Sequence, residues 1–303
     1  MGSRPEPTRL EFDRPDGARI FVEVHTPPVP AEDPPILVLD GIGCSGWAFR
    51  KIIPKLAQRR RVALVHHRGH GNSPNPPRPW RLSMHTLADD AADVAHRAGL
   101  DKALVVGFSM GFQVALELYR RHRPQVRGLI SIAGPIGQPL STFGGSDWAA
   151  SAMPVVATAS RIARGTLRRL WTGLLPSRLV RELSLRTSVD ASRIDVADLE
   201  IYLRQMAEVS PDLFISMLEQ AQAHCADDLL TDIRVPTLVI AGSRDGFVPP
   251  TALRRAAFEI PGGRWQLIEG ATHALPAEYP LTITQAIEEL ADELATERPR
   301  LRA

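Results

Sequence analysis

A serine lies between two glycines in the run Val105-Val106-Gly107-Phe108-Ser109-Met110-Gly111, where an apolar segment gives way to a helical pattern. Residues 103–106 are apolar without alternation, which favours a strand buried on both faces of a parallel sheet. Residues 110–122 have the spacing of a helix. A turn this tight strains the serine, and flanking glycines remove Cβ atoms that would clash. The run therefore predicts that the Ser109 hydroxyl stands above the sheet as a nucleophile.

The same alternation of strands and helices extends over most of the chain. We expect strands at 8–12, 19–24, 36–39, 62–65, 103–106, 128–132, 235–241 and 264–268, and helices at 47–58, 87–98, 110–122 and 283–294. The first two strands form a hairpin around a Pro- and Gly-containing turn. This order predicts an α/β fold: a doubly wound, mostly parallel eight-stranded sheet with helices on both faces.

The alternation breaks at about Gly134, where a long segment without a buried strand begins. Residues 135–230 are helical in pattern, and a structureless loop of that length inside a domain is implausible. We therefore expect a helical cap, or lid, inserted after the sixth strand. The predicted division is a core domain of residues 1–134 and 231–303 and a cap domain of residues 135–230.

Composition excludes several classes of protein. The 303 residues carry a net charge of +2, too near neutral to indicate nucleic-acid binding. Cys44 and Cys225 form neither a disulfide framework nor a metal set. The chain has no run of 18 apolar residues and no secretory pattern at its start, so we expect a cytoplasmic protein without a membrane span. The sequence leaves the oligomeric state open between a monomer and a homodimer.

A nucleophilic serine needs a base, and the base needs a group to orient it. Catalytic groups of doubly wound sheets follow the carboxyl ends of strands. Of the nine histidines, His273 follows the last expected strand and lies downstream of the serine, so we predict that it is the base. Asp245 follows the preceding strand and is the predicted acid. The alternative acid position, at 133–136, reads Ala-Gly-Pro-Ile and has no carboxylate.

The chain resembles the α/β-hydrolase superfamily, in which Ser109, Asp245 and His273 match the nucleophile, acid and histidine positions. Residues 39–43 resemble that superfamily's oxyanion loop, and residues 65–73 resemble its Asp-x-Arg-Gly-x-Gly-x-Ser loop. The resemblance implies an oxyanion hole made by the backbone N–H groups of Ile42 and Met110. It also implies a reaction that needs neither a metal nor an organic cofactor.

Two residues depart from the pattern of that superfamily. Asp40 stands where histidine is usual, and His66 stands where aspartate is usual. A carboxylate beside a hole that binds anions is unfavourable unless it is paired. We therefore hypothesise that His66 or Arg68 pairs with Asp40.

The predicted chemistry is acyl transfer to Ser109 from a small to medium apolar ester, thioester or lactone. Hydrolysis of a carbon–carbon or amide bond by the same triad, and a ligand-sensing protein that retains the triad, stay open as alternatives. The candidate substrate pocket consists of Asp40, Trp47, Trp148 and Phe214. The insertion also carries the arginines Arg161, Arg164, Arg168, Arg169, Arg178, Arg181 and Arg186. We favour a solvated helix face for them over a site for an anionic substrate or a lipid headgroup surface.

Overall fold

The computed structural model describes residues 6–141 and 148–296 and contains one eight-stranded sheet. The strands are β1 (Thr8–Asp13), β2 (Arg19–His25), β3 (Glu32–Leu39), β4 (Arg60–His66), β5 (Ala103–Phe108), β6 (Val126–Ile132), β7 (Thr237–Gly242) and β8 (Arg264–Ile268). Their order in the sheet is β1-β2-β4-β3-β5-β6-β7-β8. The pairs β1–β2 and β2–β4 are antiparallel, and all other neighbours are parallel. The predicted fold class is confirmed.

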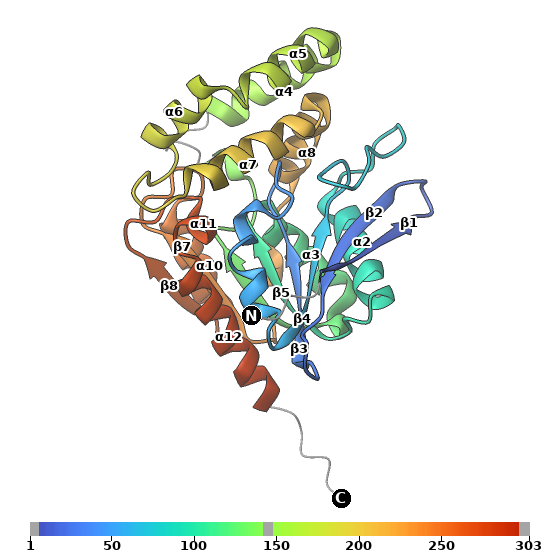
Figure 1. The fold of residues 1–303 in the computed structure, drawn as a ribbon, viewed down its shortest axis with the longest axis vertical. Helices are drawn as coiled ribbons and strands as arrows, with labels where there is room; N and C mark the ends of the chain where they lie inside the picture. Colours follow the sequence, from blue (N-terminus) through green and yellow to red (C-terminus); the bar gives the residue numbers. More distant parts are fainter. Residues whose placement is uncertain (1–5, 142–147, 297–303) are drawn as a thin grey trace, which may run out of the picture.

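Helices cover both faces of the sheet (Figure 1). They are α1 (Ile53–Leu56), α2 (Met84–Arg97), α3 (Met110–His122), α10 (Pro250–Glu259), α11 (Leu275–Glu278) and α12 (Pro280–Thr296), with short 3-10 turns η1 (Trp47–Phe49), η2 (Arg123–Gln125) and η3 (Pro139–Ser141). The helix expected at 47–58 is divided into η1 and α1. Pro54 lies in the first turn of α1, where a residue without an N–H costs no hydrogen bond. The sequence analysis did not identify α10.

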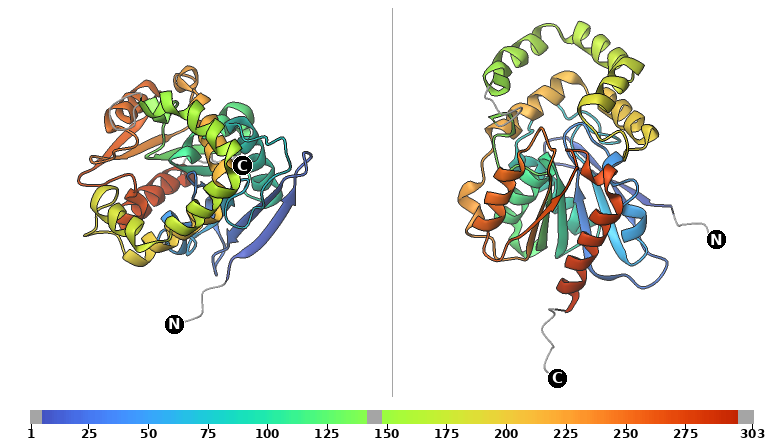
Figure 2. Two further views of the ribbon diagram at one scale, coloured as in Figure 1. Left: turned by 90° about the horizontal axis from the view of Figure 1, so that it is seen from above. Right: turned by 90° about the vertical axis from the view of Figure 1, so that its left-hand side faces the viewer.

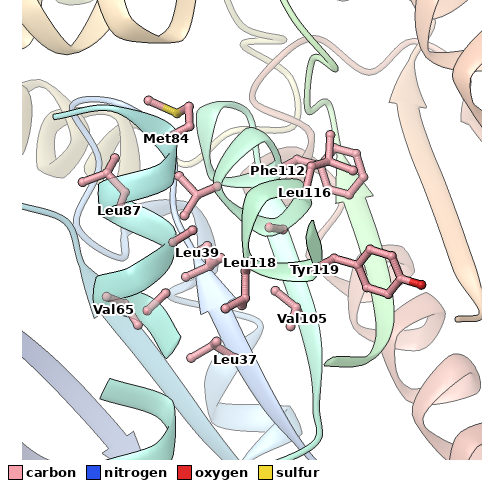
Figure 3. Packing of buried hydrophobic residues seen from close by; sticks show 14 of the residues in the cluster. Leu37, Leu39, Val65, Met84, Leu87, Val105, Phe112, Leu116, Leu118 and Tyr119 are labelled. Carbon is pink, nitrogen blue, oxygen red and sulfur yellow. The ribbon is translucent and has the colours of Figure 1, made fainter. Parts of the chain in front are cut away.

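The central strands are buried on both faces, which explains why their sequences do not alternate. Leu37 and Leu39 of β3 belong to the core beneath α2 and α3, whereas Ile36 and Val38 belong to the core on the opposite face. Figure 3 shows the first of these two cores, in which strand residues such as Val105 pack against side chains from α2 and α3. This packing holds β5 and α3, and therefore the turn between them, in a fixed position.

Between β6 and β7 the chain forms six helices in its described part. They are α4 (Trp148–Ile162), α5 (Arg164–Leu174), α6 (Arg178–Thr187), α7 (Val196–Glu208), α8 (Pro211–Ala223) and α9 (Asp227–Leu230). Helices α7 and α8 lie over one end of the sheet, and α4, α5 and α6 form a layer farther out (Figures 1 and 2). Among the described residues, no helix is long and apolar enough to cross a bilayer.

Candidate active site

Ser109 occupies the turn between β5 and α3 with a backbone conformation that is rare for a residue with a side chain. Its φ is 52° and its ψ is −126°. The turn leaves no room for a side chain at the two flanking glycines. A Cβ at Gly107 would overlap the backbone of Phe112, and a Cβ at Gly111 would overlap the carbonyl of Leu39. Glycine at both positions lets the chain turn sharply enough to place the serine side chain at the carboxyl end of the sheet.

The side chains of Ser109, His273 and Asp245 form a continuous chain of hydrogen bonds. Nε2 of His273 lies 3.0 Å from Oγ of Ser109, and Nδ1 lies 2.8 Å from Oδ2 of Asp245. A carboxylate accepts a hydrogen bond from Nδ1–H, which leaves Nε2 of the neutral ring as the acceptor for the serine hydroxyl. Asp245 is buried, and its other oxygen accepts the N–H groups of Phe247 at 2.8 Å and Val248 at 3.0 Å. The structure thus brings together the three residues that the sequence analysis selected from three distant loops.

The backbone N–H groups of Ile42 and Met110 are the donors that the resemblance assigns to an oxyanion hole. Met110 is the first residue of α3, where the helix dipole favours negative charge. Within the described residues, neither N–H donates to a protein acceptor. Both residues also line the cavity that contains Ser109. Two such donors in the cavity that contains the Ser109 hydroxyl suit an oxygen that gains negative charge during a reaction.

A cavity of about 470 Å³ opens beside Ser109 and His273. Trp47 and Phe214, two of the predicted pocket residues, line it together with largely apolar neighbours that include Leu175, Val180, Tyr202, Leu203, Met206 and Leu218. Asp40 does not line the cavity, which corrects the expectation for this residue. The side chain of Trp148 lies outside the described residues. The cavity suits a ligand with an apolar body whose reactive group reaches the serine.

The model of a protein family described as the alpha/beta hydrolase fold matches residues 34–279. This match covers most of the chain, including the loops that carry Ser109, Asp245 and His273. The chain belongs to this family.

Individual relatives span nearly the same length as this α/β hydrolase. It is 26% identical over 262 residues to the pimeloyl-[acyl-carrier protein] methyl ester esterase of Aeromonas hydrophila, covering 85% of this chain and 95% of that protein. It is 30% identical over 247 residues to the magnesium-chelatase 30 kDa subunit of Rhodobacter capsulatus, covering 80% of this chain and 81% of that protein. Its fold matches that of a thermophilic esterase from Thermogutta terrifontis with a TM-score of 0.75 and 24% identity. The match covers 95% of this chain and 99% of that structure.

In this α/β hydrolase, Asp40 organises the loop that carries Ile42. Its carboxylate accepts the N–H of Gly41 at 2.8 Å and the N–H of Gly46 at 2.7 Å. The hypothesis that His66 or Arg68 pairs with Asp40 is wrong, because Arg68 pairs with Asp16 and Asp90, and Nδ1 of His66 accepts the N–H of Asn72. Burial raises the pKa of Asp40 to about 6, although the N–H groups of Gly46 and Gly41 act in the opposite direction. The departure from histidine at this position is therefore accommodated inside the loop.

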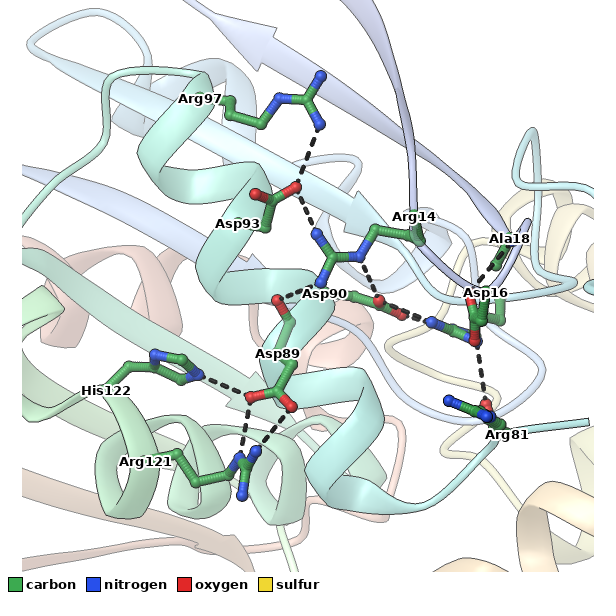
Figure 4. Close-up of polar contacts among 11 residues, drawn as sticks. Arg14, Asp16, Ala18, Arg81, Asp89, Asp90, Asp93, Arg97, Arg121 and His122 are labelled. Atoms are coloured by element: carbon green, nitrogen blue, oxygen red, sulfur yellow. Dashed lines mark hydrogen bonds and ion pairs between the residues drawn. The ribbon is translucent and has the colours of Figure 1, made fainter.

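Arg68 instead belongs to a buried ionic network that anchors the neighbouring loop. Its Nε lies 2.6 Å from Oδ2 of Asp90 in α2, and its guanidinium also pairs with Asp16. Arg14 contacts the other oxygen of Asp90 at 2.9 Å and also pairs with Asp93 (Figure 4). Two arginines share the carboxylate of Asp90 here, and each also has an acidic partner of its own, so the buried charges are compensated within the network.

Two buried histidines support the oxyanion loop, and the sequence analysis did not assign them a role. His70 accepts the N–H of Gly43 at 2.9 Å through Nε2, and its Nδ1 lies 3.0 Å from the carbonyl of Arg68, to which it donates. His67 donates from Nε2 to the carbonyl of Asp40 at 3.1 Å. Burial lowers the pKa of His70 to about 4 and that of His67 to about 3. Both rings are therefore neutral at neutral pH, as the acceptor role of His70 requires.

Gln205 and Glu278 are two further residues that position the site and that no sequence motif indicated. Gln205 of α7 accepts the N–H of Ser45 at 3.2 Å and donates to its carbonyl at 3.1 Å, which ties the segment just after residues 39–43 to the insertion. Glu278 of α11 is buried and accepts the N–H of Thr272 at 2.9 Å and its hydroxyl at 2.7 Å. Thr272 directly precedes His273. Such contacts join residues far apart in sequence, so a local pattern does not reveal them.

Proposed function

We propose that this α/β hydrolase is a serine esterase that cleaves a carboxylic ester, a thioester or a lactone through an acyl-enzyme on Ser109. The hydrogen-bond chain from Ser109 through His273 to Asp245, at the wall of an apolar cavity, is the observation that carries the proposal. In it Ser109 is the nucleophile, His273 is the base and Asp245 orients the histidine.

The reaction proceeds in two steps. Oγ of Ser109 bonds to the carbonyl carbon while its proton passes to Nε2 of His273, and the amides of Ile42 and Met110 hold the resulting oxyanion. Each such donor contributes on the order of 3 kcal/mol to transition-state stabilisation. The tetrahedral intermediate collapses, the carbon–oxygen bond to the leaving group breaks, and His273 protonates that group. A water molecule then attacks the acyl-enzyme by the same route and releases the acid.

The substrate that fits best has a small to medium apolar body. The predicted pocket residues Trp47 and Phe214 border the cavity, and its remaining lining is largely aliphatic. The similarity to a protein named as a methyl ester esterase supports an ester as the bond cleaved. In this proposal the core domain, residues 1–134 and 231–303, supplies the reacting groups, and the cap domain, residues 135–230, supplies much of the pocket.

Labelling with a fluorophosphonate, combined with steady-state hydrolysis of p-nitrophenyl esters of increasing chain length, tests the proposal. We expect stoichiometric labelling of the wild-type protein, no labelling of Ser109→Ala, and sustained turnover that depends on chain length. A p-nitroanilide and a β-diketone of matched size serve as controls for amide and carbon–carbon cleavage.

Three outcomes would contradict this function. Labelling that survives Ser109→Ala would remove the nucleophile assignment. Faster turnover of the anilide or the diketone than of every ester would assign another bond. A burst of one equivalent without steady-state turnover would indicate a ligand-sensing protein.

A further inference from the structure

The outer helices of the insertion expose large apolar side chains to solvent. The exposed fractions are 72% for Val155, 81% for Ile162, 53% for Leu170, 51% for Leu174 and 73% for Leu179. These residues lie on α4, α5 and α6, which together form the layer farthest from the sheet (Figure 2). Single exposed aliphatic residues are ordinary on protein surfaces, but a concentration of them in one layer marks an interaction surface.

The same layer is strongly basic. Residues 148–187 contain seven arginines and one carboxylate, Glu182, although the whole chain has a net charge of only +2. Arg181 pairs with Glu182 and Glu200, and Arg164 lies 3.8 Å from Asp212. The side chains of Arg168, Arg169, Arg178 and Arg186 are exposed and form no ion pair with any described residue. The layer therefore presents positive charge that the fold itself does not neutralise.

On α5 the exposed leucines and the arginines occupy different sides of the helix. Leu170 and Leu174 are one turn apart on the same side, and Arg168 and Arg169 project from the rest of the helix surface. Trp171 faces inward and donates from Nε1 to the carbonyl of Met206 at 3.0 Å. None of the described residues of α5 is buried. Helices that lie in a bilayer interface combine basic and apolar residues in this way.

We propose that α4, α5 and α6 dock on the surface of an anionic lipid bilayer. The leucines enter the boundary between headgroups and acyl chains, and the arginines contact lipid phosphates. An acidic protein would match the charge equally well. Arginine is enriched at protein interfaces too, but so are aromatic residues and methionine, whereas the large apolar side chains exposed in this layer are all aliphatic.

Docking in this orientation places the bilayer next to the cavity. Leu175 follows α5 directly, and Val180 and Ser184 belong to α6; all three line the cavity beside Ser109. An apolar ester held in the bilayer would therefore reach the nucleophile along a short path. This last step rests on the proposed esterase function, whereas the docking does not.

Co-sedimentation of the full chain with vesicles tests the docking without any need for catalysis. We compare phosphatidylcholine vesicles with vesicles of phosphatidylcholine and phosphatidylglycerol in a 7:3 ratio. We expect binding to the anionic vesicles only, and we expect it to weaken as salt shortens the Debye length. Ser109→Ala should bind like the wild type, so a failure of the esterase proposal leaves this measurement intact.

Two pairs of variants separate the charged from the apolar contribution. The double variant R168E/R169E should lose at least about 25-fold in vesicle partitioning, since each arginine near such a surface is worth roughly fivefold. Its control, R9E/R254E, changes the net charge equally at exposed sites outside the insertion and should bind like the wild type. L170S/L174S should also weaken binding, whereas V29S/L281S, which alters residues that are 57% and 64% exposed, should not. All four should hydrolyse a short soluble ester at the wild-type rate.

Several results would overturn the proposal. They are an absence of vesicle binding, equal binding to neutral and anionic vesicles, and equal loss in R168E/R169E and its control. A stable dimer that L170S/L174S dissociates, without vesicle binding, would show that a second copy of this chain covers the layer. Capture of an acidic protein without vesicle binding would assign the surface to that class of partner.

Discussion

The carboxylate of Glu278 accepts the backbone N–H of Asp190 at 2.7 Å, and the same carboxylate accepts two hydrogen bonds from Thr272. Thr272 directly precedes His273, whereas Asp190 follows α6 in the helical insertion. One buried carboxylate thus joins the loop of the proposed base to the helices that cover it. Glu278 is therefore a positioning residue, which acts on His273 through the loop and does not touch the reacting atoms.

Replacement of Glu278 by glutamine should disturb the histidine loop selectively. The side-chain nitrogen of the glutamine would face one of the N–H or O–H donors, so one buried hydrogen bond would be lost. The loss of one such bond corresponds to about a tenfold change in a rate. We expect kcat for a short ester to fall by about that factor while KM changes little. Glu289→Gln, at an exposed site on α12, is the control. A rise in KM with kcat unchanged would contradict the positioning role.

Asp245→Asn should nearly abolish hydrolysis while leaving the fold intact. The amide can donate to Nδ1 of His273, which would place the proton on Nε2 and remove the acceptor for the Ser109 hydroxyl. We expect kcat to fall on the order of 10⁴-fold, with little change in thermal stability. Asp232→Asn, at an exposed site, should retain full activity. Activity within tenfold of the wild type in Asp245→Asn would remove Asp245 from the proposed triad.

The pH dependence of stability should reveal the buried carboxyl of Asp40. Burial raises its pKa from an ordinary 3.8 to about 6, so the folded protein holds this proton more tightly than the unfolded chain. The resulting stabilisation is fully present below pH 3.8 and is lost as pH rises through 6. We expect the free energy of unfolding of the wild type, measured against Asp40→Asn, to fall on the order of 3 kcal/mol over that interval. A flat difference would show that the carboxyl titrates normally.

Acid should destabilise the oxyanion loop through His70. Its folded pKa of about 4 lies below the ordinary 6.5, so the unfolded chain binds the proton first. The stability that neutral His70 contributes is present above pH 6.5 and is lost as pH falls through 4. His70→Gln retains an acceptor for the N–H of Gly43 but does not titrate, so urea unfolding at pH 7 and pH 4.5 should show a smaller loss for the variant. An identical loss in both proteins would contradict this assignment.

The fold and the candidate triad were largely predictable because local patterns carry them. Apolar runs marked the central strands, a hairpin pattern marked the first two, and Gly107, Ser109 and Gly111 marked the turn between strand and helix. His273 and Asp245 followed from a rule that depends only on order, since both come directly after strands whose carboxyl ends meet at one edge. The division of the helix at 47–58 was less clear, because Pro54 suits a helix start as well as a break.

Other features depended on side-chain direction, which the order of residues does not specify. The sequence suggested an ionic partner for Asp40, but its carboxylate turns back onto its own loop and accepts backbone N–H groups instead. Arg68 meets Asp90 and Asp16 because α2 and the β1–β2 turn pack beside it. These pairings follow from how separate elements pack against one another.

The amino-acid sequence by itself determined the order of the eight strands, the strained turn at Ser109 and the three loops of the proposed triad. Each of these depends on hydrophobic periodicity, glycine geometry or position along the chain, all of which act over a few residues. Only the tertiary structure decided what supports the triad, what lines the cavity and which arginines are left without a partner. Those outcomes depend on contacts between distant segments, such as the one between Glu278 and Asp190, and such contacts exist only once the core has packed.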